Sequence, residues 1–90
     1  MATTDIINSN VALRWVLNSG RVGYAPAMDE YESLHVGQGT SGQAVYTFRN
    51  VRTGRYLYAD LGGNCYTFER HRGVYTPVSR SAAVAVAGAH

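Results

Sequence analysis

The stretch that best predicts the fold is Ala44-Val45-Tyr46-Thr47-Phe48-Arg49-Asn50-Val51-Arg52-Thr53-Gly54-Arg55-Tyr56-Leu57-Tyr58-Ala59. Its first six residues alternate between two faces with a period of two, which is typical of a half-buried strand. Asn50 can accept hydrogen bonds from nearby backbone N–H groups, and Gly54 can adopt a positive φ without steric cost. Tyr56 and Tyr58 then share one face of the returning strand. The stretch therefore predicts a β-hairpin closed by a G1 bulge.

A weaker copy of this pattern precedes it, and 34 residues separate Gly20 from Gly54. Residues 15–25 read Trp-Val-Leu-Asn-Ser-Gly-Arg-Val-Gly-Tyr-Ala. We expect a strand over residues 11–17, a tight turn at Gly20 and a partner strand over residues 21–25. A fixed period of this length is typical of a chain built from copies of one supersecondary unit. The sequence therefore predicts two hairpin repeats, over about residues 11–40 and 44–73.

Further turn signals predict that the β pattern continues. Gly62-Gly63-Asn64 precedes a predicted strand over residues 65–69, and His71-Arg72-Gly73 precedes another over residues 74–78. Residues 29–34 fit either one helical turn or a strand, and the glycine-rich residues 37–42 predict a loop. We expect an all-β domain over residues 11–79, either a small antiparallel sandwich or barrel or a partial trefoil-like module.

The two ends of the chain differ from this β domain. Residues 1–10 are polar and include Asn8-Ser9-Asn10, which predicts an N-terminal arm that ends in a turn. Residues 80–90 form a tail rich in Ala and Val that fits either a helix or an alternating strand. Because chain ends fray unless they are tied down, we hypothesise that both ends pack against a neighbouring subunit.

Length and charge restrict the possible functions. Ninety residues make one small domain, in the size range where partners often contribute to stability. All eight basic residues are Arg, with two of them against four carboxylates in residues 1–40 and six against two in residues 41–80. This asymmetry is compatible with head-to-tail association, with a polyanionic ligand or with solvated loop charges. A net charge of +2 is low for a nucleic-acid-binding domain, so we do not expect that partner.

Catalytic and targeting signals are few. Cys65, His71 and Asp60 could be arranged as nucleophile, base and orienting group, but a lone Cys in a strand is usually a small core residue. The three His residues lack metal-ligand spacing, and no phosphate-binding loop is present. The N-terminus lacks a secretory pattern and no apolar run suits a membrane span. We expect a non-catalytic protein made in the cytoplasm, without cofactor or metal.

Residues 45–57, Val-Tyr-Thr-Phe-Arg-Asn-Val-Arg-Thr-Gly-Arg-Tyr-Leu, resemble the repeat unit of β-trefoil proteins, notably ricin-B-type lectins and fascin-like domains. Those repeats run from an apolar strand through Asn and Ser/Thr-Gly-Lys/Arg to Tyr/Cys-Leu. The chain has two such units where a trefoil has three, and no Gln lies two residues before Trp15 to give the Gln-x-Trp signature. The resemblance implies a carbohydrate-binding function.

The seven Tyr and one Trp suggest a binding face, because a Tyr side chain offers a large contact area with a polar tip. The alternative is that these Tyr side chains fill the core, as they do in many small β proteins. The candidate binding residues are the aromatic and Arg side chains Trp15, Tyr46, Arg49, Arg52, Arg55, Tyr56, Tyr58 and Arg72. The candidate turn residues are Gly20, Asn50, Gly54 and Gly73. The sequence predicts a structural module that joins its own copies or docks on a larger assembly, such as a bacteriophage capsid that it decorates. The alternative is a lectin-like carbohydrate-binding module.

Overall fold

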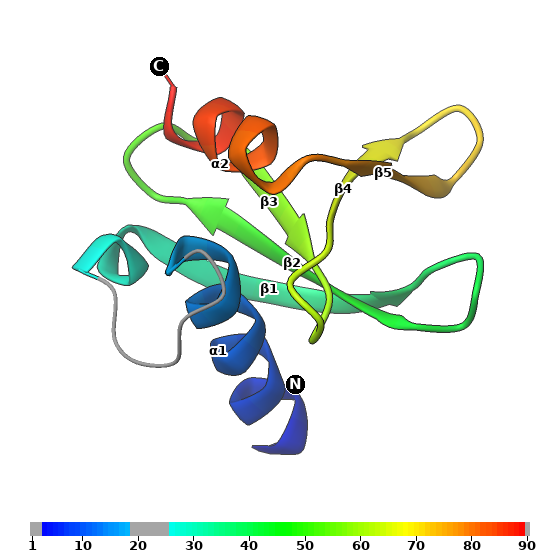
Figure 1. Cartoon of the computed structure of the whole chain (residues 1–90), viewed down its shortest axis with the longest axis horizontal. Coiled ribbons are helices and arrows are strands. Elements are labelled where there is room, and N and C mark those ends of the chain that lie inside the picture. Colours follow the sequence, from blue (N-terminus) through cyan, green and yellow to red (C-terminus); the bar gives the residue numbers. More distant parts are fainter. Residues whose placement is uncertain (1–2, 19–25, 90) are drawn as a thin grey trace.

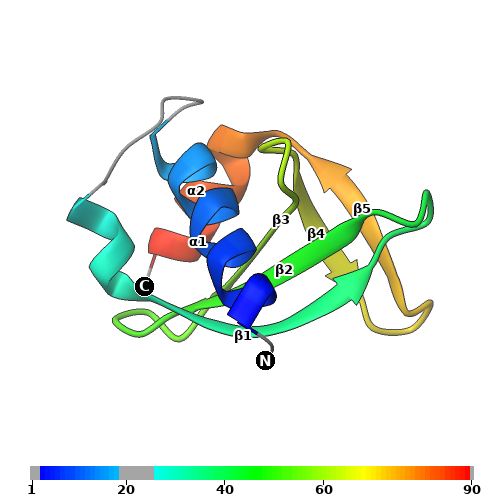
Figure 2. The same cartoon turned by 90° about the horizontal axis from the view of Figure 1, so that it is seen from below.

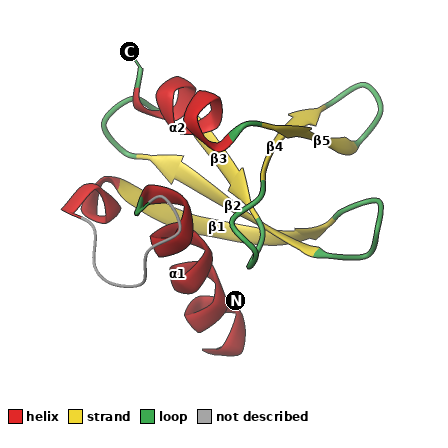
Figure 3. Cartoon of the chain, in the orientation of Figure 1, coloured by secondary structure: helices red, strands yellow, loops and turns green. Residues whose placement is uncertain are grey.

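The computed structural model describes residues 3–18 and 26–89, which form one antiparallel sheet with two α-helices (Figures 1 and 3). In chain order the elements are α1 (Thr3–Leu17), the 3-10 helix η1 (Pro26–Glu30), β1 (Tyr31–Gln38), β2 (Ala44–Asn50), β3 (Tyr56–Ala59), β4 (Cys65–Glu69), β5 (Val74–Val78) and α2 (Arg80–Gly88). The sheet order is β1-β2-β3-β4-β5, so each strand pairs with the next one along the chain. The predicted antiparallel β character is confirmed. The strands form an open five-stranded sheet, and the chain also contains two α-helices.

The β2–β3 hairpin has the geometry that the sequence predicts. Phe48 pairs with Leu57 across the two strands. In the turn, the side-chain Oδ1 of Asn50 accepts hydrogen bonds from the backbone N–H groups of Arg52 and Thr53, at 2.9 and 3.1 Å. Gly54 has a φ of 76°, which glycine adopts without the strain that a Cβ atom would cause. Gly73 likewise has a positive φ of 65°, in the β4–β5 turn. Three of the four predicted turn residues therefore serve as expected.

The first predicted strand is wrong, because residues 11–17 belong to α1. Ser9, Ala12, Leu13 and Val16 follow the i, i+3, i+4, i+7 spacing of one helical face, and all four are buried. The predicted irregular arm also belongs to this helix from Thr3 onward. The first hairpin repeat is therefore not formed by these residues. Its turn at Gly20 and its second strand, residues 21–25, lie outside the described residues.

The ambiguous segment before the sheet takes both of its possible conformations. Residues 26–30 form η1 and residues 31–38 form β1, so the predicted loop begins at Gly39 rather than at Gly37. The pairing of β1 with β2 shifts register between Ser33 and His35, which marks a β-bulge.

Both helices pack against one face of the sheet (Figure 2). The core combines buried apolar side chains of the sheet and the helices: Ala12, Leu13, Val16, Tyr46, Phe48, Leu57, Ala59, Cys65 and Ala87. The residues of β2 and β3 in this set are register partners, Tyr46 with Ala59 and Phe48 with Leu57, as the period of two requires. The core therefore lies between the sheet and the helices.

The C-terminal segment forms α2. Ser79 is its N-cap, with the side-chain Oγ accepting a hydrogen bond from the backbone N–H of Ala82 at 3.2 Å. Ala87 is completely buried in the core. The segment predicted as a tail for a neighbouring subunit thus packs on the sheet of its own chain.

The sheet is uneven in two places. β3 and β4 pair at only two register positions, Tyr58 with Tyr66 and Ala59 with Cys65, so the two strands separate toward Tyr56 and Phe68. On the face away from the helices, the ring of Tyr75 in β5 lies where a side chain at Gly37 in β1 would be. The two edge strands therefore approach each other over that face, and this shape creates the two surfaces described next.

Candidate binding surfaces

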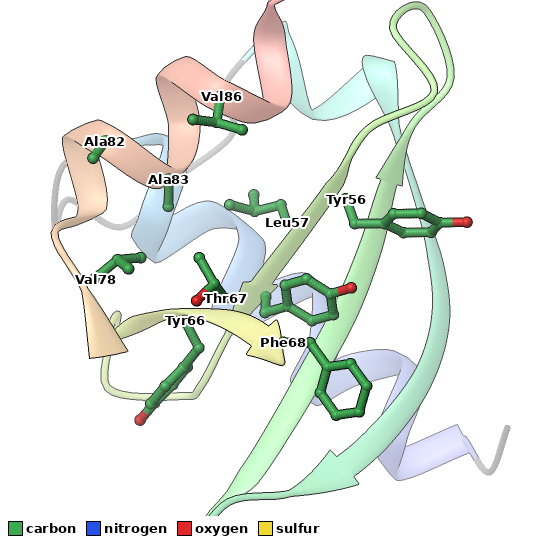
Figure 4. A pocket seen from close by; sticks show the side chains of 10 residues that line it. Tyr56, Leu57, Tyr66, Thr67, Phe68, Val78, Ala82, Ala83 and Val86 are labelled. Carbon is green, nitrogen blue, oxygen red and sulfur yellow. The ribbon is translucent and has the colours of Figure 1, made fainter. Parts of the chain in front are cut away.

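An apolar cleft opens where β3 and β4 separate beside α2 (Figure 4). Its volume is about 300 Å³. Tyr56 and Leu57 line it from β3, Phe68 from β4, and Ala83 and Val86 from α2. None of the side chains that line it carries a formal charge. We call this site the apolar cleft.

Large apolar side chains are exposed around this cleft. Tyr56 is 43% exposed, Phe68 38% and Val86 58%. Single exposed apolar residues are common on protein surfaces, but three that surround one apolar hollow form a contiguous patch. Such a patch is typical of a surface that contacts another apolar surface.

A second site, which we call the aromatic pocket, lies on the sheet face opposite the helices and has a volume of about 190 Å³. Four rings form its walls. The ring centroids of Tyr56 and Tyr58 are 6.4 Å apart, those of Tyr58 and Tyr75 5.7 Å, and those of Phe68 and Tyr75 5.0 Å. These separations lie in the range of favourable aromatic pairs, so the rings support one another's positions.

Polar groups complete the aromatic pocket. His35 and Thr47 face each other across β1 and β2, with 3.4 Å between the ring Nε2 and the hydroxyl Oγ1. Arg70, which follows β4, also lines the pocket. Burial raises the pKa of Tyr58, as do Tyr75 and Tyr56, while Arg70 opposes the rise. The Tyr58 hydroxyl therefore stays protonated at neutral pH and can donate a hydrogen bond. The pocket combines apolar ring faces with hydroxyl, imidazole and guanidinium groups.

The turn between β3 and β4 holds these surfaces in place through Asp60, which is 7% exposed. Its Oδ1 accepts hydrogen bonds from the backbone N–H groups of Gly62 and Asn64, and its Oδ2 accepts one from the hydroxyl of Tyr66 at 2.7 Å. Burial would raise the pKa of Asp60, but the hydrogen bonds from Tyr66, Asn64 and Gly62 outweigh it and hold that pKa below its ordinary value. The turn therefore fixes Tyr66 at one of the two register positions where β3 and β4 pair.

The four Arg residues predicted for binding are engaged within the chain. Arg49 pairs with Glu32 at 3.2 Å, and Arg72 with Glu69 at 3.2 Å. Arg52 pairs with Glu30 at 3.1 Å and also donates to the carbonyl of Gly88 at 2.9 Å. Arg55 donates to the backbone carbonyl of Ala89 at 2.9 Å, and the hydroxyl of Thr53 donates to the backbone carbonyl of Ala87 at 2.6 Å. The β2–β3 turn thus caps the C-terminus of α2, where unpaired carbonyls and the helix dipole favour cationic donors.

Two of these pairs join the acidic and the basic halves of the sequence. Glu30 and Glu32 come from the acidic half of the chain, and Arg52 and Arg49 from the basic half. Two Arg residues of the basic half are thus paired with two carboxylates of the acidic half inside one molecule, so this part of the asymmetry needs no head-to-tail contact.

The predicted aromatic residues fall into different places. Tyr56 and Tyr58 line both the apolar cleft and the aromatic pocket. Tyr46 is only 2% exposed and belongs to the core, so its side chain is not available to a partner. Trp15 lies on α1, with its ring close to Gly63 in the β3–β4 turn, and helps to hold the helix on the sheet.

Sequence reasoning missed Phe68, Arg70, Tyr75 and His35 as members of the aromatic pocket. The alternation of residues 65–69 and 74–78 places Phe68 opposite Tyr75, as the register confirms. That pairing was the available signal. Unlike Arg49, Arg52 and Arg72, Arg70 has no ion pair within residues 3–18 and 26–89.

Cys65 is buried, and burial raises the pKa of its thiol to about 11, with Arg80 opposing the rise. The sulfur is therefore a neutral thiol at neutral pH, which does not suit a nucleophile. Within the part of the chain that the structure describes, no three His, Cys, Asp or Glu side chains gather as metal ligands.

No family model matches the chain, and no curated protein and no solved structure matches it either. The resemblance of residues 45–57 to trefoil repeats therefore stays a prediction. None of the helices in the described ranges is long and apolar enough to cross a membrane.

Proposed function

We propose that this protein is a non-catalytic assembly module that associates with its own copies through the apolar cleft. The observation that carries the proposal is the ring of exposed apolar side chains, Tyr56, Phe68 and Val86, around an uncharged hollow of about 300 Å³. Covering this patch removes apolar surface from water, which is the main favourable term in protein association.

A second copy suits this surface because the surface contains both a projection and a hollow. Val86 projects from α2 at the edge of the cleft and is 58% exposed. In a two-fold arrangement the same patch meets itself, so Val86 of each copy can enter the cleft of the other. The absence of charge in the cleft lining means that no like charges would be brought together there.

The larger assembly that we propose from the sequence is a bacteriophage capsid, on which such modules would sit as decoration or minor structural proteins. The small size of the chain and its apolar cleft support a structural role of this kind.

The test of self-association is the substitution Val86→Asp, with Val51→Asp as its matched control. Val51 is 53% exposed in the β2–β3 turn and does not line the cleft, so its exposure resembles that of Val86 while its position does not. Because a carboxylate in an apolar interface is strongly unfavourable, we expect Val86→Asp to weaken self-association by roughly tenfold or more. Sedimentation velocity over a concentration series measures this, and Val51→Asp should behave as the wild type. Equal association of all three proteins would refute the cleft as the contact.

A second candidate function, carbohydrate binding, is favoured by the aromatic pocket. Stacked rings beside hydroxyl and imidazole groups form a suitable surface for a sugar, whose ring has an apolar face and a polar edge. The trefoil-like stretch lies in the β2–β3 hairpin, which contributes Thr47, Tyr56 and Tyr58 to this pocket. The pocket therefore supports the lectin-like alternative without requiring a complete trefoil.

A further inference from the structure

We infer that the aromatic pocket binds an acidic sugar, a six-membered ring that carries a carboxylate, and that Arg70 recognises the carboxylate. This inference rests on the carbohydrate-binding alternative and does not depend on self-association through the apolar cleft. Its basis is the combination, in one pocket, of ring faces, neutral polar groups and a cation that has no acidic partner among residues 3–18 and 26–89.

The size of the pocket fits one ring. Its volume is about 190 Å³, and a cavity of about 150 Å³ is large enough to hold benzene. Tyr58, Phe68 and Tyr75 lie with their centroids 5.0 to 6.3 Å apart, so the three rings pack on one another and form one continuous aromatic wall beside this space. The pocket therefore suits a monosaccharide unit rather than an extended chain lying flat.

The polar groups favour a hydroxylated ligand over a purely aromatic one. Thr47 is almost fully buried, and its hydroxyl lies 3.4 Å from the imidazole Nε2 of His35 at the same pocket. The hydroxyl of Tyr58 is an additional donor. Thr47 and His35 bond each other, but a ligand without hydroxyl groups would leave the Tyr58 hydroxyl and the remaining hydrogen-bonding capacity of Thr47 and His35 unused, which is unfavourable once water is excluded.

The charge distribution favours an anion. The two acidic side chains nearest to Arg70 in the chain are engaged elsewhere: Glu69 bonds Arg72 and the hydroxyl of Thr76, and Asp60 bonds the turn that follows it and the hydroxyl of Tyr66. Arg70 lines the pocket and has no ion pair in the described ranges. A guanidinium can bind a carboxylate through two parallel hydrogen bonds, which gives direction as well as attraction.

The experiment is an NMR titration of the ¹⁵N-labelled protein with three probes at equal ionic strength: glucuronate, glucose and benzoate. Glucuronate and glucose share the sugar ring and differ in the carboxylate, whereas benzoate has the carboxylate on a ring without hydroxyl groups. We expect glucuronate to shift the amide signals of pocket residues and to bind about tenfold more tightly than either other probe.

Arg70→Gln and Arg72→Gln form the matched pair of variants. Both residues lie after β4, but Arg70 lines the pocket and Arg72 is an exposed partner of Glu69. Arg70→Gln should make glucuronate bind as weakly as glucose, and Arg72→Gln should leave the preference intact. Arg70→Lys, which keeps the charge but loses the two-pronged geometry, should give an intermediate affinity.

The other outcomes overturn the inference in distinguishable ways. Equal binding of glucose and glucuronate would refute the acidic preference and leave carbohydrate binding standing. Benzoate binding without sugar binding, or no binding by any probe, would refute both the acidic preference and carbohydrate binding by this pocket. Equal loss in Arg70→Gln and Arg72→Gln would show general charge attraction rather than recognition by Arg70. Val86→Asp should still bind glucuronate, which separates this result from the test of the cleft.

Discussion

At the scale of the residue, Asp60 shows how one carboxylate can hold a turn. Two backbone N–H groups, the side-chain amide of Asn64 and the hydroxyl of Tyr66 all donate to it. Tyr66 in turn accepts a hydrogen bond from the side chain of Gln43 in the β1–β2 loop, at 3.2 Å. The carboxylate therefore connects two turns at the end of the sheet where β3 and β4 pair.

We expect Asp60→Asn to lower the free energy of unfolding at neutral pH by about 1–3 kcal/mol, because the amide has only one acceptor oxygen for these donors. The folded-state pKa of Asp60 is lowered, so the charged form stabilises the fold above the unfolded-state pKa. That stabilisation is lost as the pH falls through the folded-state pKa. Urea unfolding from neutral to acidic pH should show the difference between wild type and variant shrinking on acidification. A difference that does not change with pH would contradict this account.

Gly54 provides a test of backbone conformation alone. Its φ is 76°, and nothing lies within 4 Å of the position that a Cβ atom would occupy. Gly54→Ala should therefore destabilise the protein by about 1–2 kcal/mol through strain in the left-handed region. Gly62→Ala is the control, because its Cβ would make only ordinary contacts at 3.4 Å. A thermal melt in which both variants match the wild type would refute the assigned turn.

At the scale of the element, the hairpins could be predicted from sequence and the helices could not. The conformation of the β2–β3 turn is determined by its local sequence, because Asn50 supplies the side-chain hydrogen bonds and Gly54 the positive φ within five residues. In α1, Asn8-Ser9-Asn10 resembles a turn, and the i, i+3, i+4, i+7 face of Ser9 to Val16 has to outweigh that local signal by packing on the sheet.

The C-terminal helix illustrates the same conflict. Residues 83–87 alternate Ala and Val like a strand, yet Ala favours the helix and Ser79 provides a cap that a strand would not use. The candidate site could likewise be predicted only in part from local sequence. Tyr56 and Tyr58 could be identified from local alternation, whereas the roles of the Arg residues depend on which acids of β1 and η1 pair with them across the sheet.

We expect Ser79→Ala to destabilise the protein by about 1 kcal/mol, since it removes the side-chain acceptor for the Ala82 N–H. Ser81→Ala is the control, because Ser81 lies in the first turn of the same helix and is exposed. As Ala is the better helix former, that control should be neutral or slightly stabilising. Denaturant titration compares the two, and a greater loss in Ser81→Ala would contradict the cap.

At the scale of the whole molecule, the divergence of β3 and β4 gives the chain its two binding surfaces. Tyr56, Tyr58 and Phe68 line both the apolar cleft and the aromatic pocket, so the cleft and the pocket share a wall. The helices cover the buried core cluster of the sheet, and the β2–β3 turn holds α2 in place by its C-terminal carbonyls. The exposed apolar surface that remains beside α2 is what our account assigns to contact with a second copy.

The most direct measurement is the solution mass of the wild-type chain by light scattering across a range of concentrations. If the chain self-associates through the apolar cleft, the mass should rise from that of one 9.8 kDa chain to at least twice that value as the concentration increases. A mass of 9.8 kDa at every concentration, with a sharp cooperative melt, would show that the folded chain leaves the apolar cleft uncovered and would contradict self-association.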